Sequence, residues 1–183
     1  MIQEIRLYGD EVLRRPADDV CDFGATLQQL ASDLLMTQAA AKAVGVAAVQ
    51  IGVEQNVFSI DGSTVERRGR REVLVNPQVV ETHGEVVEEE GCLSFPGIFV
   101  PIRRPEWVAI RAQNLDGKEI EREATGYLAR AYLHEIDHLR GRLFTDLMDA
   151  DTRRDVIRRM RSIRARERSG TFARFFPFAR ATS

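Results

Sequence analysis

Residues 134–138 read His134-Glu135-Ile136-Asp137-His138, and most of what this sequence predicts can be built outward from them. Two histidines four positions apart in a helix lie one turn apart on the same face, where both imidazoles can reach one ion. Glu135 is offset from the first histidine by about 100° around the helix. Its carboxylate can therefore reach a water on that ion without being a ligand. This HExxH pattern is typical of metal-dependent hydrolases in which the glutamate is the general base.

Apolar neighbours place the histidine pair on the buried side of this helix. Leu128, Ala131 and Leu139 recur near the pair at helical spacing and predict a helix over residues 127–140. The alternative is an amphipathic helix with surface histidines, which these neighbours disfavour.

A third ligand has to come from elsewhere, because catalytic zinc-type sites use three protein ligands and keep a fourth position for water. A third histidine at metzincin spacing is absent, since that position is Phe144. The downstream carboxylate Glu167 lies in an arginine-rich stretch, and the remaining histidine is His83. Cys92 is the remaining candidate, because a thiolate and two imidazoles make a tetrahedral site with one open position. The alternative for Cys92 is a small buried apolar residue.

Three segments, in this order, resemble the motifs of the peptide deformylase family. Residues 44–50 read VGVAAVQ, residues 90–94 read EGCLS and residues 134–138 read HEIDH. The family motifs are GxGxAAxQ, EGCLS and HExDH, and the resemblance covers roughly residues 5–150. Ala43 departs from the glycine that opens the first motif, and Leu133 departs from a glutamine that often precedes the third.

The resemblance implies a metal-dependent hydrolase that removes the formyl group from N-formyl-methionyl peptides and releases formate. One divalent metal is implied, Fe²⁺ in the cell, with Zn²⁺, Ni²⁺ or Co²⁺ able to occupy the site. Glu135 would be the base, and the Gln50 side-chain amide and the Leu93 backbone N–H would stabilise the oxyanion. The implied metal ligands are Cys92, His134 and His138.

The same resemblance implies four residues that contact the substrate. Gly45 would contact the backbone of the bound peptide, because a missing Cβ allows an extended chain to approach closely. Val44, Arg130 and Ala131 would form walls around the methionine side chain. For Arg130, a position on the surface is an equal alternative.

Composition excludes several other classes of protein. The chain has 183 residues, of which 44% are hydrophobic and 30% are charged, with a net charge of −2. These values argue against a disordered chain and against a globally basic nucleic-acid binder. Two cysteines cannot form a disulfide framework and suit a reducing compartment. With no apolar signal segment and no membrane span visible, we expect a cytoplasmic protein, and we expect a monomer.

Hydrophobic periodicity predicts an α+β fold. We expect antiparallel β-sheets packed around the central HExxH helix, followed by a C-terminal helix. A first helix is predicted to stop near Gly45, and an Asp116-Gly117 turn predicts a hairpin. The predicted helices cover 25–44, 127–140 and 151–168, and the predicted strands cover 46–48, 57–60, 72–87, 107–113 and 118–123.

The end of the chain differs from the rest. We expect a catalytic domain over residues 1–150 and a basic helix with an aromatic tail over residues 151–183. Residues 151–168 contain eight arginines and three acidic residues. The family uses a C-terminal helix to dock on the ribosome, which a basic face would suit. The alternative is a solvated helix held by its apolar edge. The aromatic residues of the tail are Phe172, Phe175, Phe176 and Phe178.

Two other functions compete with the deformylase hypothesis. A diverged metallohydrolase could act on another small acyl-amine, as the departures at Ala43 and Leu133 suggest. A non-catalytic ribosome-associated protein could use the metal only structurally. Against the second, three ligands with an adjacent glutamate leave an open position, whereas structural zinc is normally held by four protein ligands.

Overall fold

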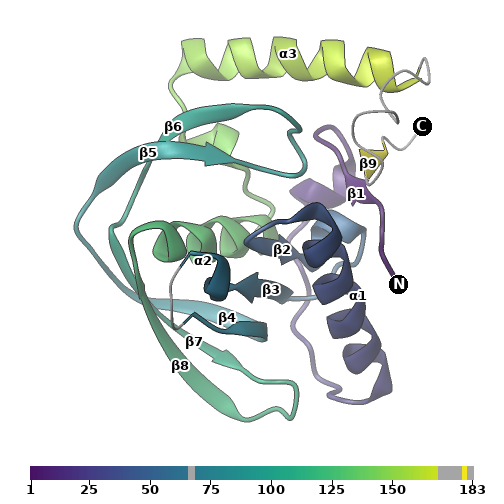
Figure 1. The fold of residues 1–183 in the computed structure, drawn as a ribbon, viewed down its shortest axis with the longest axis vertical. Helices are drawn as coiled ribbons and strands as arrows, with labels where there is room; N and C mark the ends of the chain where they lie inside the picture. Colours follow the sequence, from purple (N-terminus) through teal and green to yellow (C-terminus); the bar gives the residue numbers. More distant parts are fainter. Residues whose placement is uncertain (66–68, 169–178, 181–183) are drawn as a thin grey trace.

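The structure is a computed structural model that describes residues 1–65, 69–168 and 179–180. The predicted α+β class is confirmed: antiparallel sheets surround a central helix, and a further helix follows near the C-terminus (Figure 1). The α-helices are α1 (Ala25–Ala41), α2 (Gly126–Leu139) and α3 (Ala150–Arg168). The strands are β1 (Ile5–Arg6), β2 (Gly45–Ala47), β3 (Val57–Asp61), β4 (Arg71–His83), β5 (Val86–Gly91), β6 (Phe99–Arg104), β7 (Trp107–Gln113), β8 (Glu119–Thr125) and β9 (Ala179–Arg180).

The largest sheet has the strand order β2-β3-β4-β7-β8, with every neighbouring pair antiparallel. A second antiparallel sheet pairs β5 with β6, and β1 pairs in parallel with β9. Figure 1 shows α2 between the large sheet and the β5–β6 pair. The predicted hairpin is present as β7 and β8.

Helix α2 is buried because it lies between these layers. Tyr132 and Ile136 pack with residues of the large sheet such as Phe58 and Ile110 in one apolar cluster. Burial on several sides explains why even the polar residues of the HExxH segment have little exposed surface. The HExxH segment therefore lies in the interior of the fold.

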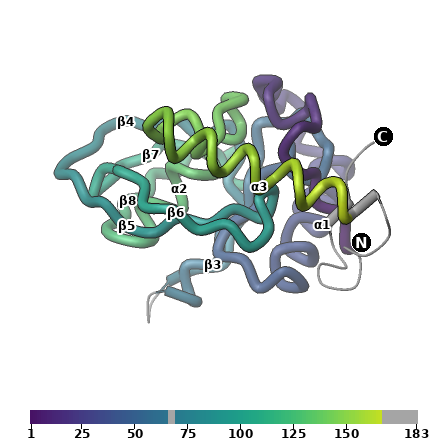
Figure 2. The backbone as a smooth tube through the Cα atoms, turned by 90° about the horizontal axis from the view of Figure 1, so that it is seen from above, coloured from purple at the N-terminus to yellow at the C-terminus, as the bar shows by residue number. Residues whose placement is uncertain are grey.

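Helix α3 runs alongside the β5–β6 pair, as Figure 2 shows from above. Val156 and Met160 are 1% and 0% exposed and pack in a cluster that includes Phe95 and Ile98. Phe95 and Ile98 belong to the loop after Cys92. The apolar edge of α3 thus supports the loop that carries the cysteine.

Three details differ from the sequence-based expectations. Helix α1 ends at Ala41 rather than at residue 44, because Lys42 adopts a left-handed conformation (φ 53°, ψ 38°) and caps the helix. Gly45 is therefore the first residue of β2 and not the helix stop. Ala48 begins the 3-10 helix η2 (Ala48–Ile51) instead of ending a strand.

Strand β6 has no counterpart among the predicted strands. Val100, Ile102 and Arg104 point inward, so the alternation is regular, but the third inward residue is charged and Pro101 interrupts the run. The aromatic residues predicted for the tail lie between residues 169 and 178, outside the described residues. Within the described part of the chain, no helix is long and apolar enough to cross a membrane.

Candidate active site

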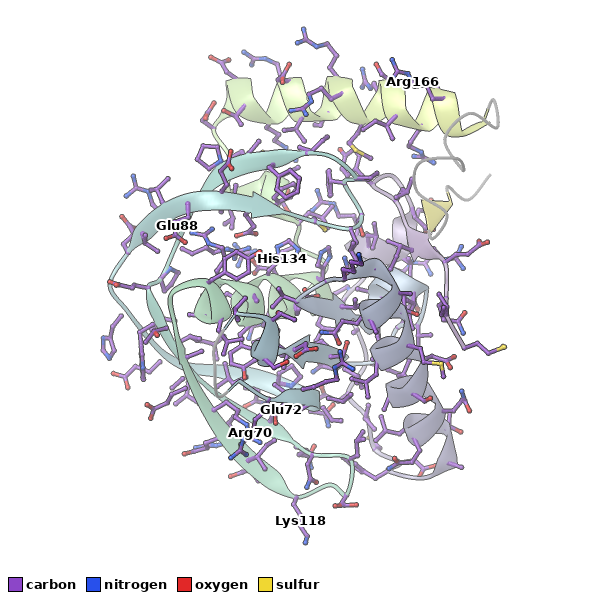
Figure 3. The ribbon with its side chains drawn as sticks, in the orientation of Figure 1. Arg70, Glu72, Glu88, Lys118, His134 and Arg166 are labelled. Carbon is purple, nitrogen blue, oxygen red and sulfur yellow. The ribbon has the colours of Figure 1, made fainter. Side chains whose placement is uncertain are left out.

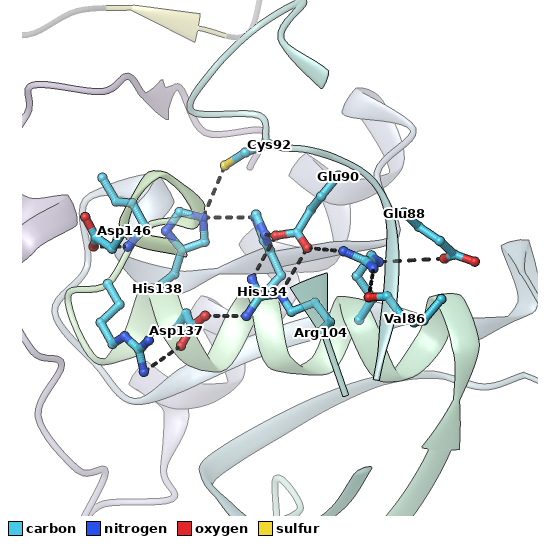
Figure 4. A network of polar contacts seen from close by, with 12 residues as sticks. Val86, Glu88, Glu90, Cys92, Arg104, His134, Asp137, His138 and Asp146 are labelled. Carbon is cyan, nitrogen blue, oxygen red and sulfur yellow. Dashed lines mark hydrogen bonds and ion pairs between the residues drawn. The ribbon is translucent and has the colours of Figure 1, made fainter. Parts of the chain in front are cut away.

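The three predicted metal ligands come together from two elements. Cys92 directly follows β5, while His134 and His138 lie one turn apart on α2. The Cys92 Sγ and His138 Nε2 atoms are 3.2 Å apart, and the two histidine Nε2 atoms are also 3.2 Å apart. All three ligand atoms lie within 4.8 Å of one another. Figure 4 shows the three side chains converging. One sulfur and two nitrogens in this arrangement fit a tetrahedral divalent ion with one position left open.

The electrostatics also favour positive charge where these atoms converge. Burial lowers the pKa of His134, but the Cys92 thiolate and the Glu90 carboxylate outweigh it and raise that pKa well above its ordinary value. Burial and the positive charge of His134 lower the pKa of His138. These shifts favour a single positive charge where the ligand atoms converge, which a bound cation would supply in place of a proton on His134.

The second ring nitrogen of His134 is fixed by Glu90. The distance from His134 Nδ1 to Glu90 Oε1 is 2.6 Å, and Glu90 is 4% exposed. A carboxylate in this position makes Nδ1 the protonated nitrogen, so Nε2 presents its lone pair to the ligand centre. His138 Nδ1 has no hydrogen-bond partner among the described residues.

Glu90 also anchors a group of four charges, which we name the buried charge cluster: Glu90, Arg104, Arg130 and Asp137. Arg104 donates to both Glu90 oxygens, at 3.0 and 2.8 Å, and Arg130 donates to Glu90 Oε2 at 2.8 Å. Arg104 Nη1 also lies 2.5 Å from Asp137 Oδ2. The two guanidinium groups balance the two carboxylates, which is the condition for burying such groups.

The ion pairs of this region define the surroundings of three charged residues. Arg104 is the arginine that pairs with Glu90, whereas Arg103 pairs with Glu85 at the surface. Asp137 binds an arginine and not a ligand imidazole. Arg130, for which a surface position was an equal alternative, is 2% exposed.

Glu135 lies beside the ligands with an unsatisfied carboxylate. Its Oε2 atom is buried and has no hydrogen-bond partner among the described residues. Burial raises the pKa of Glu135 to about 7, against the opposing effect of the positive charge on His134. A buried carboxylate of this kind, one residue from a metal ligand, is suited to accept a proton from water.

Gly45 packs directly against this carboxylate. A Cβ at position 45 would lie 2.6 Å from Glu135 Oε1 and 2.8 Å from its Cγ. The absence of a side chain at Gly45 therefore leaves room for the base itself. The sequence-based explanation, close approach of a peptide, identified the residue but not this contact.

Gln50 is held by its own backbone segment. Its Oε1 accepts a hydrogen bond from the Ala47 N–H at 2.9 Å, which turns its NH₂ group toward Cys92 Sγ, 3.6 Å away, and Ser94 Oγ, 3.3 Å away. Gln50 is 1% exposed. Leu93 lines the same cavity next to Cys92. Gln50 and Leu93 thus both line the cavity beside Cys92.

Gln50, Cys92, His134 and Glu135 line a cavity of about 570 Å³, whereas His138 is not among its lining residues. That volume is in the range of small-molecule and short-peptide sites. All four predicted substrate-contacting residues line it: Val44, Gly45, Arg130 and Ala131. Lining residues that the motifs do not indicate include Lys42, Phe99 and Tyr127, and the two aromatic side chains are 63% and 50% exposed.

The two departures from the family motifs leave this geometry intact. Ala43 has no positive φ, because the left-handed position is taken by Lys42, so alanine is tolerated there. Leu133 packs against the apolar cluster around α2. Neither residue is a predicted metal ligand or the predicted base.

Comparisons with known proteins agree with this arrangement. The family model for polypeptide deformylase matches residues 2–154. A peptide deformylase of Thermodesulfovibrio yellowstonii is 43% identical over 79% of this chain and 88% of its own length. A peptide deformylase of Acidobacterium capsulatum is 42% identical over 89% of this chain and 96% of its own length.

A solved structure shares the fold as well as the sequence. The crystal structure of a peptide deformylase from Legionella pneumophila is 38% identical, with a TM-score of 0.84 over 90% of this chain and 96% of that chain. Both the sequence and the fold therefore match over nearly the whole catalytic region. This chain belongs to the peptide deformylase family, the enzymes that remove the N-formyl group from newly made polypeptides.

Proposed function

We propose that this chain removes the formyl group through the site built by Cys92, His134, His138 and Glu135. The observation that carries the proposal is the unsatisfied Glu135 carboxylate beside three convergent ligand atoms. A structural metal site would need a fourth protein ligand and no free base. The alternatives of a different acyl-amine substrate or a non-catalytic role are not favoured by the relatives.

Cys92, His134 and His138 would hold one divalent ion, and we propose Fe²⁺ as the ion in the cell. Zn²⁺, Ni²⁺ or Co²⁺ could occupy the same ligands. When bound, the ion supplies Lewis acidity that lowers the pKa of a water from about 15.7 toward about 7. Glu90 would keep His134 in the ligating tautomer throughout.

Glu135 then carries the proton transfers. It accepts a proton from the water whose oxygen attacks the formyl carbon, and it later delivers that proton to the nitrogen of the leaving amine. The C–N bond breaks, and the products are formate and a free N-terminal methionine. The Gln50 NH₂ group and the Leu93 N–H would donate to the oxyanion; one such donor is typically worth about 2.7–4 kcal/mol of activation free energy.

The substrate would enter as an extended chain. Gly45 opens β2, whose backbone can pair with a peptide strand, and the methionine side chain would lie against Val44 and Ala131. Arg130 also lines the cavity, but its guanidinium is engaged by Glu90. We therefore expect the methylene stem of Arg130, and not its charge, to contact the methionine.

The remaining proposals concern the whole chain. We propose a catalytic domain over residues 1–150, with residues 151–183 as an appendage, and a monomer that acts in the cytoplasm.

The outer face of α3 is strongly basic: Arg154 and Arg158 have side chains 74% and 80% exposed. We propose that this face docks on the ribosome. Ribosome co-sedimentation should then decrease steeply with salt and in an Arg154→Glu, Arg158→Glu variant; binding unaffected by both changes would contradict docking.

The reaction itself is tested by the release of free amine from formyl-Met-Ala, with acetyl-Met-Ala as the matched control. Protein purified without oxygen and loaded with Fe²⁺ or Ni²⁺ should turn over the formyl peptide alone. Equal turnover of both peptides would favour the diverged hydrolase. No turnover with one equivalent of metal bound would contradict the proposal.

A further inference from the structure

The charged residues that line the cavity differ sharply in exposure. Glu90, Arg130, His134 and Glu135 line its floor, and they are between 2% and 7% exposed. Lys42 is the remaining charged residue of the lining, and it is exposed. The ammonium group of Lys42 is therefore the solvent-facing charge of this cavity, on the side formed by the end of α1.

Lys42 is held at this position by an unusual backbone conformation. It adopts the left-handed region, which favours glycine or asparagine, and its N–H caps α1 by donating to Ala39 and Gln38 carbonyl oxygens. Among the described residues Lys42 forms no ion pair, whereas Glu88 on β5 is paired with Arg130 at 3.8 Å. Lys42 is thus free to pair with a ligand in the cavity.

The composition makes this lysine conspicuous. Lys42 and Lys118 are the two lysines in a chain that otherwise uses arginine for its basic residues. Lys118 is exposed in the turn between β7 and β8, well away from His134 (Figure 3). It provides a matched control for any effect attributed to Lys42.

A peptide whose formyl group lies at the predicted metal ligands extends from the buried floor toward the exposed lining residues, which include Lys42, Phe99 and Tyr127. The formylated methionine fills the floor, so the next residues lie near the mouth, at about 3.3 Å of chain per residue. We propose that Lys42 is a specificity-determining residue that favours formylated peptides with aspartate or glutamate at the second or third position. This inference rests on the proposed function and deepens it.

A purely structural role is the competing explanation, since a lysine at a helix C-terminus interacts favourably with the helix dipole. Such a role would change stability but not the preference among peptides. The preference is measured as the ratio of kcat/KM for formyl-Met-Ala-Glu-amide to that for formyl-Met-Ala-Gln-amide, and for the pair with the two downstream residues exchanged. Amidated peptides remove the contribution of a terminal carboxylate.

For one of the two peptide pairs, the ratio should be about two- to fivefold at low ionic strength, the size expected for an exposed ion pair. The ratio should approach one at 1 M salt, and it should also approach one in the Lys42→Gln variant. In Lys42→Glu it should fall below one. The Lys118→Gln control should retain the ratio. A ratio of one for both peptide pairs in the unmodified chain would overturn the assignment. A preference for the acidic peptide that persists in Lys42→Gln would also overturn it. If no formylated peptide is turned over, the proposed function itself fails and this inference fails with it.

Acetylation of the two lysines provides a readout that does not depend on turnover. In a Glu135→Gln variant, formyl-Met-Ala-Glu-amide and formyl-Met-Glu-Ala-amide are each added and the acetylation rates are followed by mass spectrometry. At least one of them should slow the acetylation of Lys42 more than the matching glutamine peptide does, and neither should affect Lys118. Equal rates with acidic and neutral peptides would overturn the proposal.

Discussion

The same kinds of ion pair occur in two regions of this chain with opposite surroundings. In the buried charge cluster, Arg104 and Glu90 are each 4% exposed. On α3, the pair Arg158–Asp155 has side chains 80% and 46% exposed. Buried charges are costly unless every group is paired, whereas exposed pairs contribute little to stability. The first region therefore positions His134, a proposed metal ligand, while the second leaves a charged face exposed to solvent.

The comparison also separates what holds each region in place. The buried charge cluster is fixed by hydrogen bonds that converge on Glu90 from three side chains. Helix α3 is fixed by its apolar edge, where Met160 is fully buried. Removing a charge should thus damage the first region most, and removing a methionine should damage the second.

The largest effect is expected for Glu90→Gln. This change leaves Arg130 with Glu88 and Arg104 with Asp137 as their charged partners, and it replaces the carboxylate beside His134 by a neutral amide. The unfolding free energy should therefore fall by about 3–5 kcal/mol. Metal affinity should fall about 10–100-fold, because an outer-shell partner of a ligand histidine is lost. Denaturant unfolding and metal titration measure the two effects.

Glu89→Gln is the matched control for this change. Glu89 is the preceding residue of β5 and is exposed. It should leave both stability and metal affinity nearly unchanged. Equal effects of the two variants would remove the distinction between buried and exposed charge.

Met160→Ala should have the next largest effect, a loss of about 2–5 kcal/mol in unfolding free energy. The lost methylene and sulfur contacts leave a cavity against the loop that follows Cys92. Thermal or urea denaturation checks this value. If Met160→Ala costs no more than a surface substitution, the apolar edge does not hold α3.

Asp146→Asn should have an intermediate effect of about 1 kcal/mol at neutral pH. Asp146 is 25% exposed and binds Arg14 through both oxygens, at 2.5 and 3.1 Å. Burial alone would raise the pKa of Asp146, but the Arg14 guanidinium outweighs it and holds the pKa below its ordinary value.

The sign of the pH dependence follows from that lowered pKa. The ionised form is favoured by folding, so its stabilisation is present above the unfolded value of about 3.9 and is lost as pH falls through the folded value. The difference between the parent chain and Asp146→Asn should shrink below about pH 4 in urea titrations. A difference that stays constant from pH 7 to pH 3 would contradict this assignment.

Arg158→Gln should have the smallest effect, below about 0.5 kcal/mol, because Arg158 and Asp155 form an exposed pair three residues apart on a helix. Denaturant unfolding of this variant beside Glu90→Gln completes the comparison. A loss above 1 kcal/mol in unfolding free energy would mean that the exposed charged face of α3 contributes substantially to stability.

Local spacing predicted the parts of the site that lie within single motifs. His134, Glu135 and His138 follow from helical periodicity. Exclusion of other ligands made Cys92 a candidate, and the resemblance to the family then implied its role. Arg130 could not be placed in this way. Its burial depends on Glu90, which is 40 positions away in sequence and lies on a different element.

The fold was predictable to the same extent. Its class and the β7–β8 hairpin follow from alternation and turn residues, whereas β6 did not, because an inward-facing arginine looks polar until its carboxylate partner is known. The end of α1 was misplaced for a related reason. Gly45 carries the expected stop signal, but Lys42 adopts the left-handed conformation instead, and Gly45 is needed beside Glu135.

The most direct test of this account is the metal content of a Glu135→Gln variant measured together with its turnover of formyl-Met-Ala. We expect one equivalent of divalent metal per chain and a loss of about 10²–10⁴-fold in kcat, because the ligands remain and the base does not. Loss of the metal would identify Glu135 as a ligand. Turnover near that of the parent chain would show that another group accepts the proton, and either result would contradict the assignment of Glu135.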